Sequence, residues 1–324
     1  MHREIGSEFF GIPVCEAKNR LFDGAAWFMS GRSALLAIIE ELCASKVVKT
    51  AALPDWCCES MVQPFLEKGI KVAFYAALEP PSPLQADILL VVDYFGYDQT
   101  PVPIGFEGIV IRDTTHSLFT KQYTDAAYSF GSLRKWAGFL TGGYAFGLRH
   151  PMSELPHLRE FEYLRRDAMA AKLSYLRGER QDKAHLQLFA QAESLLDRGG
   201  LYAANENDVY HAQHLDVGAL HTARTENAML LHRYLYEFAL FEPSEDTCPL
   251  CYPILTPYRD ALRRHLIENE IYCPVHWPLA AELCPTEGTR RIYEQELSLV
   301  CDQRYGEADM MRIVRTVQEF FEKR

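Results

Sequence analysis

A carboxylate and an amine follow two successive strand-like runs in the middle of the sequence. Residues 108–111 form a short β-branched run, and Asp113 follows it after Arg112. Residues 126–130 form the next run, which is followed by Lys135. Polar side chains at strand ends are where an open α/β sheet usually presents its chemistry. Asp113 and Lys135 are therefore the first candidates for functional residues.

These two side chains suit a carbonyl cofactor such as pyridoxal 5'-phosphate. Such a cofactor needs a lysine amine that holds it as a Schiff base, and a carboxylate that keeps its pyridine nitrogen protonated. Each residue alone has a simpler interpretation, because an aspartate at a strand end is often a turn or cap residue. A lysine beside an arginine is often a solvated charge. The order of Asp113 and Lys135 along successive strand-like runs makes the chemical interpretation more specific.

A helix start near the N-terminus could hold an anion. Residues 30–42 place apolar side chains on one helical face, and Ser30 is suited to cap the helix. The start contains Gly31 and Ser33, so it offers backbone amides and a hydroxyl group to a phosphate. An ordinary capped helix is the alternative for this segment.

Composition limits the class of protein. The 324 residues are 48% hydrophobic, enough for one large α/β domain and a smaller one. The net charge of -11 argues against a nucleic-acid partner, which would need a basic surface. The first residues lack the apolar core of a signal peptide, and the apolar run at 88–92 is too short to span a bilayer. We expect a cytoplasmic protein without a membrane partner.

Nine cysteines are scattered through the chain, and we expect them to be reduced. Cys248 and Cys251 form a CxxC motif, with Cys273 and His276 not far beyond, so a zinc site is conceivable. A second CxxC motif is missing from the sequence, however, and residues 251–255 look like a strand. We therefore expect no metal.

The remaining pattern predicts the architecture. Strand-like runs lie at 47–53, 71–75, 87–93 and 241–255, and helical runs at 60–68, 151–197, 215–237, 259–269 and 308–321. Strands that alternate with helices in this way predict an α/β fold with a mostly parallel, doubly wound sheet. We expect a large cofactor-binding domain over residues 1–212 and a smaller C-terminal α+β domain over residues 213–324.

Together these features resemble the DegT/DnrJ/EryC1/StrS family of fold-type-I pyridoxal-phosphate enzymes. Asp113, Ser129-Phe130, Lys135 and Gly142-Gly143 match the order of the family's central motif. His116 stands where the family usually has a glutamine. Arg224 and Asn227 resemble the family's Arg-x-x-Asn segment, and residues 271–279 resemble its segment entering the active site.

The resemblance implies an aminotransferase that uses pyridoxal 5'-phosphate, an amino-acid amino donor and a keto sugar nucleotide as acceptor. A dehydratase or other eliminase with the same cofactor is one alternative, and a non-catalytic binding or regulatory protein with this fold is another. The resemblance also implies a homodimer, with the aromatic arm at 8–28 suited to the interface. The family's loop into the neighbouring subunit is not recognisable between residues 151 and 207.

By the same resemblance, Lys135 and Asp113 are the catalytic residues. Trp56, or Cys58 in its place, would cover the cofactor ring, and His116 would contact the ring hydroxyl or the ring face. The predicted phosphate-binding residues are Gly31, Arg32, Ser33 and Ser129.

Overall fold

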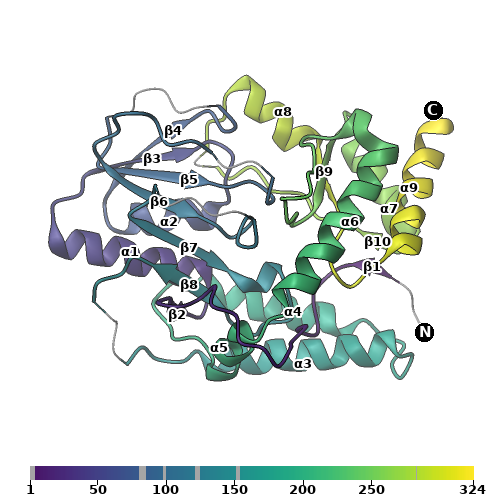
Figure 1. Ribbon diagram of the computed structural model, residues 1–324, viewed down its shortest axis with the longest axis horizontal. Helices are drawn as coiled ribbons and strands as arrows, with labels where there is room; N and C mark the ends of the chain where they lie inside the picture. The colour runs from purple at the N-terminus through teal and green to yellow at the C-terminus, as the bar shows by residue number, and fades with distance from the viewer. Residues whose placement is uncertain (1–3, 80–84, 98–99, 121–124, 151–153, 282) are drawn as a thin grey trace. The chain divides into compact units, whose positions relative to one another are not determined.

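The computed structural model describes residues 4–79, 85–97, 100–120, 125–150, 154–281 and 283–324. Its central feature is one sheet of seven strands in the order β2-β8-β7-β6-β5-β3-β4 (Figure 1). The strands are β2 (Ala26–Phe28), β3 (Thr50–Pro54), β4 (Lys71–Tyr75), β5 (Ile88–Val92), β6 (Ile109–Asp113), β7 (Tyr128–Ser132) and β8 (Gly143–Phe146). The pairs β3–β4, β3–β5 and β5–β6 are parallel, whereas β8 pairs antiparallel with β2 and β7. The predicted mostly parallel α/β fold is confirmed.

The chain divides into two compact units that interleave along the sequence. The first unit is built mainly from Glu8–Val47 and Tyr128–Asp216, and the second mainly from Val48–Ala127 and Val217–Arg324. The expected division into residues 1–212 and 213–324 stays a prediction.

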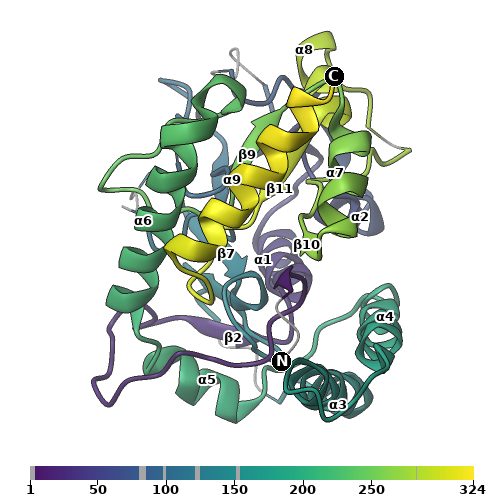
Figure 2. The same cartoon turned by 90° about the vertical axis from the view of Figure 1, so that its right-hand side faces the viewer.

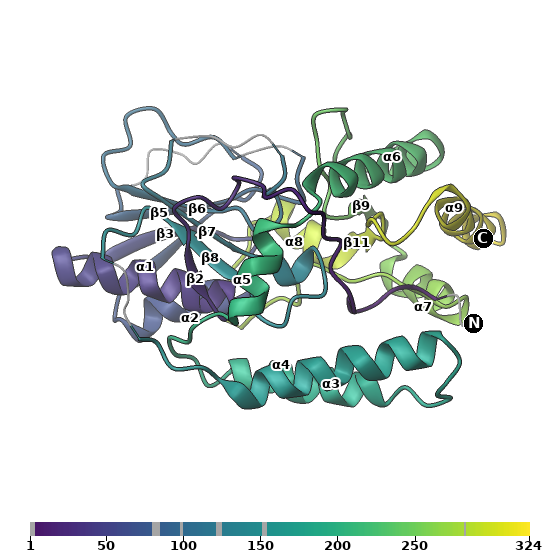
Figure 3. The ribbon, with the colours of Figure 1, turned by 60° about the horizontal axis from the view of Figure 1, so that its bottom comes forward.

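Among the described residues, the first unit contains strands β2, β7 and β8 and the α-helices α1 (Gly31–Ser45), α3 (Arg159–Leu176), α4 (Ala184–Leu196) and α5 (Glu206–Gln213). Helix α1 packs on β7 and β8, and helices α3 and α4 lie side by side (Figure 3). The single helical run predicted over 151–197 is thus wrong in one respect. Two helices form because the chain turns between them, where Gly178 has a φ of 79° that favours glycine.

The second unit holds strands β3 to β6 and the C-terminal elements. The latter are α6 (Val217–Leu235), β9 (Tyr252–Leu255), α7 (Arg259–Glu268), β10 (Ile271–Tyr272), α8 (Glu287–Gln295), β11 (Glu296–Leu299) and α9 (Glu307–Glu322). Helix α2 (Glu59–Glu67) packs on β4, and the short strand β1 (Ile5–Gly6) pairs parallel with β10. Helices α6 and α9 lie side by side (Figure 2). A short 3-10 helix, η2 (Tyr236–Phe238), follows α6.

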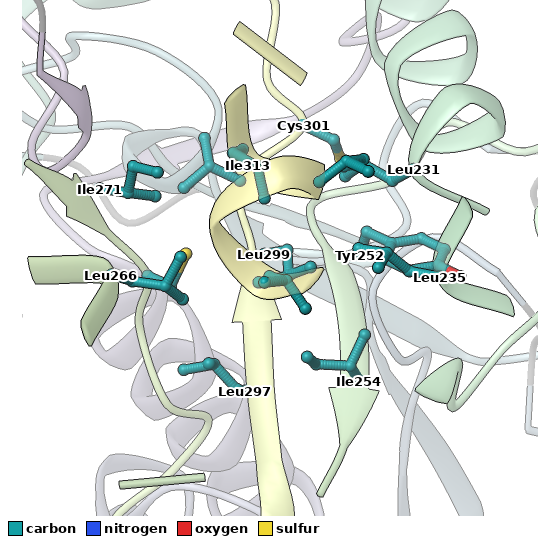
Figure 4. Packing of buried hydrophobic residues seen from close by; sticks show 14 of the residues in the cluster. Leu231, Leu235, Tyr252, Ile254, Leu266, Ile271, Leu297, Leu299, Cys301 and Ile313 are labelled. Atoms are coloured by element: carbon teal, nitrogen blue, oxygen red, sulfur yellow. The ribbon is translucent and has the colours of Figure 1, made fainter. Parts of the chain in front are cut away.

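The core of the C-terminal part lies around the antiparallel pair β9 and β11. Leu297 and Leu299 of β11 pack with Ile254 of β9 and with side chains from α6, α7 and α9 (Figure 4). The strand predicted over 241–255 is too long, since only β9 forms. The prolines at 243 and 249 lack the amide proton that a strand ladder uses, which explains the late start.

Helix α1 begins against β8 at a point where only glycine fits. Ser30 caps α1, because its hydroxyl oxygen accepts a hydrogen bond from the Ser33 amide at 3.2 Å. A Cβ atom on Gly143 would lie 2.1 Å from the carbonyl oxygen of Ser30. Backbone atoms cannot move aside as the end of a flexible side chain can, so this contact fixes the start of α1 on the sheet.

We expect Gly143→Ala to lower the free energy of unfolding by about 1–3 kcal/mol, the usual cost of overpacking. Gly288→Ala is the matched control, since a Cβ atom there meets no atom within 4 Å and the site is an exposed helical position in α8. The control should be as stable as the wild type or more stable, because alanine favours helix. Urea unfolding measures both variants, and equal stability of Gly143→Ala and the wild type contradicts the packing argument.

Candidate functional site

The predicted site residues fall in both units. Lys135, Ser129 and the start of α1 belong to the first unit, and Trp56, Asp113 and His116 belong to the second.

Lys135 ends the short 3-10 helix η1 (Leu133–Lys135), which follows β7 directly. Its side chain is half-buried, as a reactive amine that must meet a ligand requires. The Leu133 amide donates to the carbonyl oxygen of Gly142 at 2.9 Å, and Trp136 is fully buried. The backbone on both sides of Lys135 is therefore held in place.

Arg134, next to Lys135, is anchored to helices α3 and α4. Its guanidinium pairs with Glu193 of α4 and lies over the ring of Phe161. Arg165 of α3, whose side chain is 1% exposed, also donates to Glu193, at 2.9 Å. Burial favours the neutral carboxyl, but the two guanidinium groups outweigh it and hold the pKa of Glu193 below its usual value. This network fixes η1, and the sequence analysis did not identify it.

The start of α1 lies against β7, the strand that leads to Lys135. A Cβ atom on Gly31 would lie 3.4 Å from the carbonyl oxygen of Gly131 and 3.5 Å from the Cβ atom of Ser132. Tyr128 of β7 donates to Glu41 of α1 at 3.0 Å, so Tyr128 and Ser132 face α1, and Ser129 lies on the other face because side chains alternate along a strand. The first unit thus brings together a helix N-terminus, the Ser132 end of β7 and the turn that carries Lys135, and a phosphate contact of Ser129 stays a prediction.

Two residues that the sequence predicted to bind the phosphate, Ser33 and Arg32, use their side chains for other hydrogen bonds in the structure. The Ser33 hydroxyl donates to the carbonyl oxygen of Gly200 at 3.0 Å. Arg32 donates to the carbonyl oxygen of Leu196 at 2.6 Å, at the end of α4. Helix geometry leaves the amides of Gly31 and Arg32 without an acceptor inside α1, so these amides are the better donors to an anion. Roles for the side chains of Arg32 and Ser33 stay predictions.

In the second unit, Asp113 is the last residue of β6 and is buried. Its Oδ1 atom accepts a hydrogen bond from the Thr115 amide at 2.8 Å. The carboxylate therefore fixes the turn after β6 while standing at the strand end, where the sequence predicted it.

A buried ion pair positions the segment that follows Asp113. Arg112 in β6 donates to Asp93 at 2.5 Å, and the two side chains are only 2% and 0% exposed. Asp93 also accepts from the Ser117 hydroxyl at 3.0 Å, which ties the end of β5 to the loop after β6. Burial raises the pKa of Asp93 to about 6, although Arg112 and Ser117 lower it.

His116 lies in that loop and is nearly buried, at 3% exposure. Its ring is close to parallel with those of Phe95 and Trp277, at centroid distances of 5.0 and 5.4 Å. The ring of His276 meets it edge-on at 5.4 Å. Packing therefore holds the His116 ring in one orientation, as contact with a planar ligand requires.

Trp56 belongs to the same aromatic cluster. It is fully buried, stacks on Tyr94 at 4.6 Å and donates from Nε1 to the carbonyl oxygen of His276 at 2.8 Å. These contacts give Trp56 a packing role, and its contact with a cofactor ring stays a prediction. Cys58 is the N-cap residue of α2, and its sulfur lies 3.0 Å from the Ser60 hydroxyl, without a capping bond to the helix backbone.

A metal site and a membrane span are two further possibilities for the described residues. No group of three or more histidine, cysteine, aspartate or glutamate residues there is arranged to hold a metal ion. The nine cysteines all lie among the described residues, and none of them, Cys248 and Cys251 included, forms a disulfide. Within the same residues, no helix has the length and apolar character needed to cross a membrane.

Sequence reasoning missed Asp93, Ser117, Glu193 and the pair Glu296 and Ser298. Asp93 carried a usable signal, since it follows a buried apolar strand as Asp113 does. Glu296 and Ser298 carried one too, because they alternate with leucines over 296–299 and so had to share one face of a strand. The partner of Glu193 could not be found in this way, because Arg134 lies 59 residues away in the chain.

Comparison with known proteins gives similarity in structure without similarity in sequence. No protein-family model matches the chain, and no curated protein sequence does.

Three solved structures illustrate the similarity. Helicobacter pylori PseC, an aminotransferase involved in the biosynthesis of pseudoaminic acid, covers 98% of this chain and 100% of its own, with a TM-score of 0.67 and 16% identity. The putative sugar aminotransferase Spr1654 from Streptococcus pneumoniae, in its PLP form, covers 99% of both chains, with a TM-score of 0.65 and 12% identity. A DegT DnrJ EryC1 StrS aminotransferase from Brucella abortus covers 91% of this chain and 85% of its own, with a TM-score of 0.58 and 14% identity. The chain therefore has the fold of these aminotransferases, as the sequence predicted.

Proposed function

We propose that this protein is a pyridoxal-phosphate-dependent aminotransferase that moves an amino group from an amino acid to a small keto sugar, in nucleotide-linked form. The observation that carries the proposal is the place of Lys135, in the turn directly after β7, with the start of α1 against the same strand. The fold similarity over almost the whole chain supports it, since the neighbours are named as aminotransferases and one is a PLP form.

The residues present fit the cofactor. The amides of Gly31 and Arg32 form a helix N-terminus suited to a phosphate, and Ser132 offers a hydroxyl at the adjacent end of β7. Ser129 stays a proposed phosphate contact. Asp113 is a buried carboxylate at a strand end, suited to a pyridine nitrogen. His116 offers an imidazole for the ring hydroxyl or the ring face, and Trp56 stays a proposed contact for the ring.

The proposed chemistry divides between these groups. When bound, the cofactor supplies an electron sink that stabilises negative charge on the substrate carbon that carries the amine. The Lys135 amine would hold the cofactor covalently and then take and return a proton at that carbon. Asp113 would keep the pyridine nitrogen protonated, because an adjacent carboxylate favours the charged form of the ring. The buried aromatic rings around His116 would exclude water from its side of the ring.

Lys135→Ala should lose the covalent cofactor and lower turnover by about 10²–10⁴-fold, the range for loss of a general acid–base group. Borohydride reduction of the cofactor-loaded wild type, followed by peptide mass spectrometry, should place the reduced cofactor on Lys135. Lys71→Ala, which removes an exposed lysine of β4, is the control and should bind the cofactor normally. Attachment to another lysine would rule out this assignment.

Asp113→Asn should keep most cofactor binding and lower turnover by roughly 10²–10³-fold, a typical effect of removing one preorganised electrostatic contact. The neutral amide cannot hold the pyridine proton. Asp113→Glu should restore part of the activity, and Asp167→Asn on the exposed side of α3 should have no effect. The measurement is conversion of the bound cofactor by an amino donor, followed by its absorbance. Full activity in Asp113→Asn means that another group does this work.

The proposal includes a cytoplasmic homodimer, with the N-terminal arm at 8–28 in the interface. Val14 supports this, since its side chain is 53% exposed while its backbone bridges to Leu215. Light scattering at micromolar concentration should give twice the chain mass of 37.1 kDa. Val14→Glu should shift the protein toward the monomer, whereas the control Val47→Glu, at another exposed valine, should not. A fully active monomer argues against the assembly.

A further inference from the structure

A glutamate, a serine and a histidine form a hydrogen-bonded chain inside the second unit. Glu296 and Ser298 lie on β11 and are fully buried. Leu297 and Leu299 point into the core cluster (Figure 4). Side chains alternate along a strand, so Glu296 and Ser298 share the opposite face of β11. The Ser298 hydroxyl donates to Oε1 of Glu296 at 2.5 Å, and the His276 amide donates to Oε2 at 2.8 Å. Nδ1 of His276 lies 2.8 Å from Oγ of Ser298.

Among the described residues, few other ionisable groups lie near this hydrogen-bonded chain. Arg259 of α7 acts on the carboxyl group through space, and it donates to the carbonyl oxygen of Glu296 at 3.4 Å. Cys273, after β10, is buried near it, with Arg263 of α7 donating to its carbonyl oxygen. The His116 ring lies 5.4 Å from the His276 ring, and β9 places Leu255 opposite Glu296. Burial raises the pKa of Glu296 to about 7, although Ser298, the His276 amide and Arg259 lower it.

The direction of these hydrogen bonds determines the tautomer of His276. An ionised Glu296 can only accept, so the Ser298 proton points to the carboxylate. The serine oxygen then accepts from Nδ1, which must carry the imidazole proton, and Nε2 is left as an acceptor. A protonated Glu296 can donate to Ser298. Ser298 then donates to Nδ1, and Nε2 must carry the proton.

We propose that Glu296 and Ser298 are positioning residues that switch Nε2 of His276 between acceptor and donor, beside His116. One proton enters at Nε2, the Nδ1 proton passes to the Ser298 oxygen, and the serine proton passes to Oε1 of Glu296. The imidazole stays neutral throughout, and the charge of the three groups changes from -1 to 0. Because the three groups are coupled, the pKa of proton uptake belongs to the hydrogen-bonded chain of Glu296, Ser298 and His276 as a whole and not to one residue.

The consequence for catalysis rests on the proposed function. His276 lies edge-on to His116, the proposed contact for the cofactor ring, and both pack on Phe95 and Trp277. Above the pKa of the chain, Nε2 accepts a hydrogen bond from a hydroxyl or ammonium group of the substrate. Below it, Nε2 donates to a carbonyl or carboxylate group. Because burial raises the pKa of Glu296, the three groups release their proton closer to neutral pH than an exposed glutamate does, and the acceptor state dominates on the alkaline side.

Nitrogen NMR of protein labelled with ¹⁵N-histidine tests the switch without cofactor or substrate. His276→Gln identifies the His276 signals among those of the 11 histidines. Spectra are recorded from about pH 5 to about pH 9, which brackets the ordinary histidine pKa. The wild type should change from the Nδ1–H to the Nε2–H tautomer as the pH falls, before the doubly protonated ring appears. Direct passage from Nδ1–H to the doubly protonated ring overturns the proposal.

Variants separate the switch from a merely structural role. Glu296→Gln should hold the Nε2–H tautomer at every pH above the ring's own titration, because its amide can donate to Ser298 while its oxygen accepts from the His276 amide. Ser298→Ala should abolish the switch, and Ser298→Thr should restore it. Glu294→Gln, at an exposed position of α8, is the control and should behave as the wild type. If the His276 tautomer of Glu296→Gln changes with pH as it does in the wild type, the proposal is also overturned.

The pH profile of the half-reaction with an amino donor then links the switch to catalysis. The wild type should show an inflection near the NMR midpoint, and Glu296→Gln should lose it. If the tautomer switches in a protein without transaminase activity, the proposed function fails and the switch stands. If the activity is present but the tautomer is fixed, the switch fails alone. The wild-type pH series decides the matter even if Glu296→Gln does not fold.

Discussion

The guanidinium group of Arg112 is buried, and its charge has to be balanced inside the second unit. Asp93 at the end of β5 and Asp125, after the loop that leaves β6, both bond to it, and the carbonyl oxygen of Thr100 accepts from it. A buried charge that loses its partner costs several kcal/mol, so these segments must meet at Arg112. The loop with His116 starts from this point, tied by Ser117 to Asp93. The orientation of the proposed ring contact thus depends on the ion pair between Arg112 and Asp93.

Local sequence signals predicted the backbone of the site well. The strand ends at Asp113 and before Lys135, and the cap at Ser30, depend on strand propensity and capping, which act within a few residues. The same signals failed where tertiary structure decides. The hydroxyl of Ser33 and the guanidinium of Arg32 bond to carbonyl oxygens more than 160 residues away in the chain. A pattern read over short windows holds no information about such partners, so the side-chain roles were less predictable than the positions.

The similarity to known aminotransferases lies in structure, at 12–16% identity for the three structures compared. Different apolar residues can fill the core of the same fold, since cores tolerate exchange of apolar side chains if volume and pattern are kept. Chemistry is less tolerant, because an amine and a carboxylate cannot be replaced by groups of similar volume. A function for this chain therefore has to be argued from Lys135 and Asp113, which stand at strand ends, and not from the shared fold alone.

Three buried carboxyl groups of the second unit have different roles because their hydrogen-bond partners and neighbouring charges differ. Asp93 faces a guanidinium and serves to hold a loop. Asp113 accepts a backbone amide at a strand end, where a bound ring nitrogen could share it. Glu296 has only neutral donors on its oxygens, Ser298 and the His276 amide, with Arg259 acting from a distance. Since no cation touches its oxygens among the described residues, burial dominates, and Glu296 is the carboxyl group best suited to exchange a proton near neutral pH.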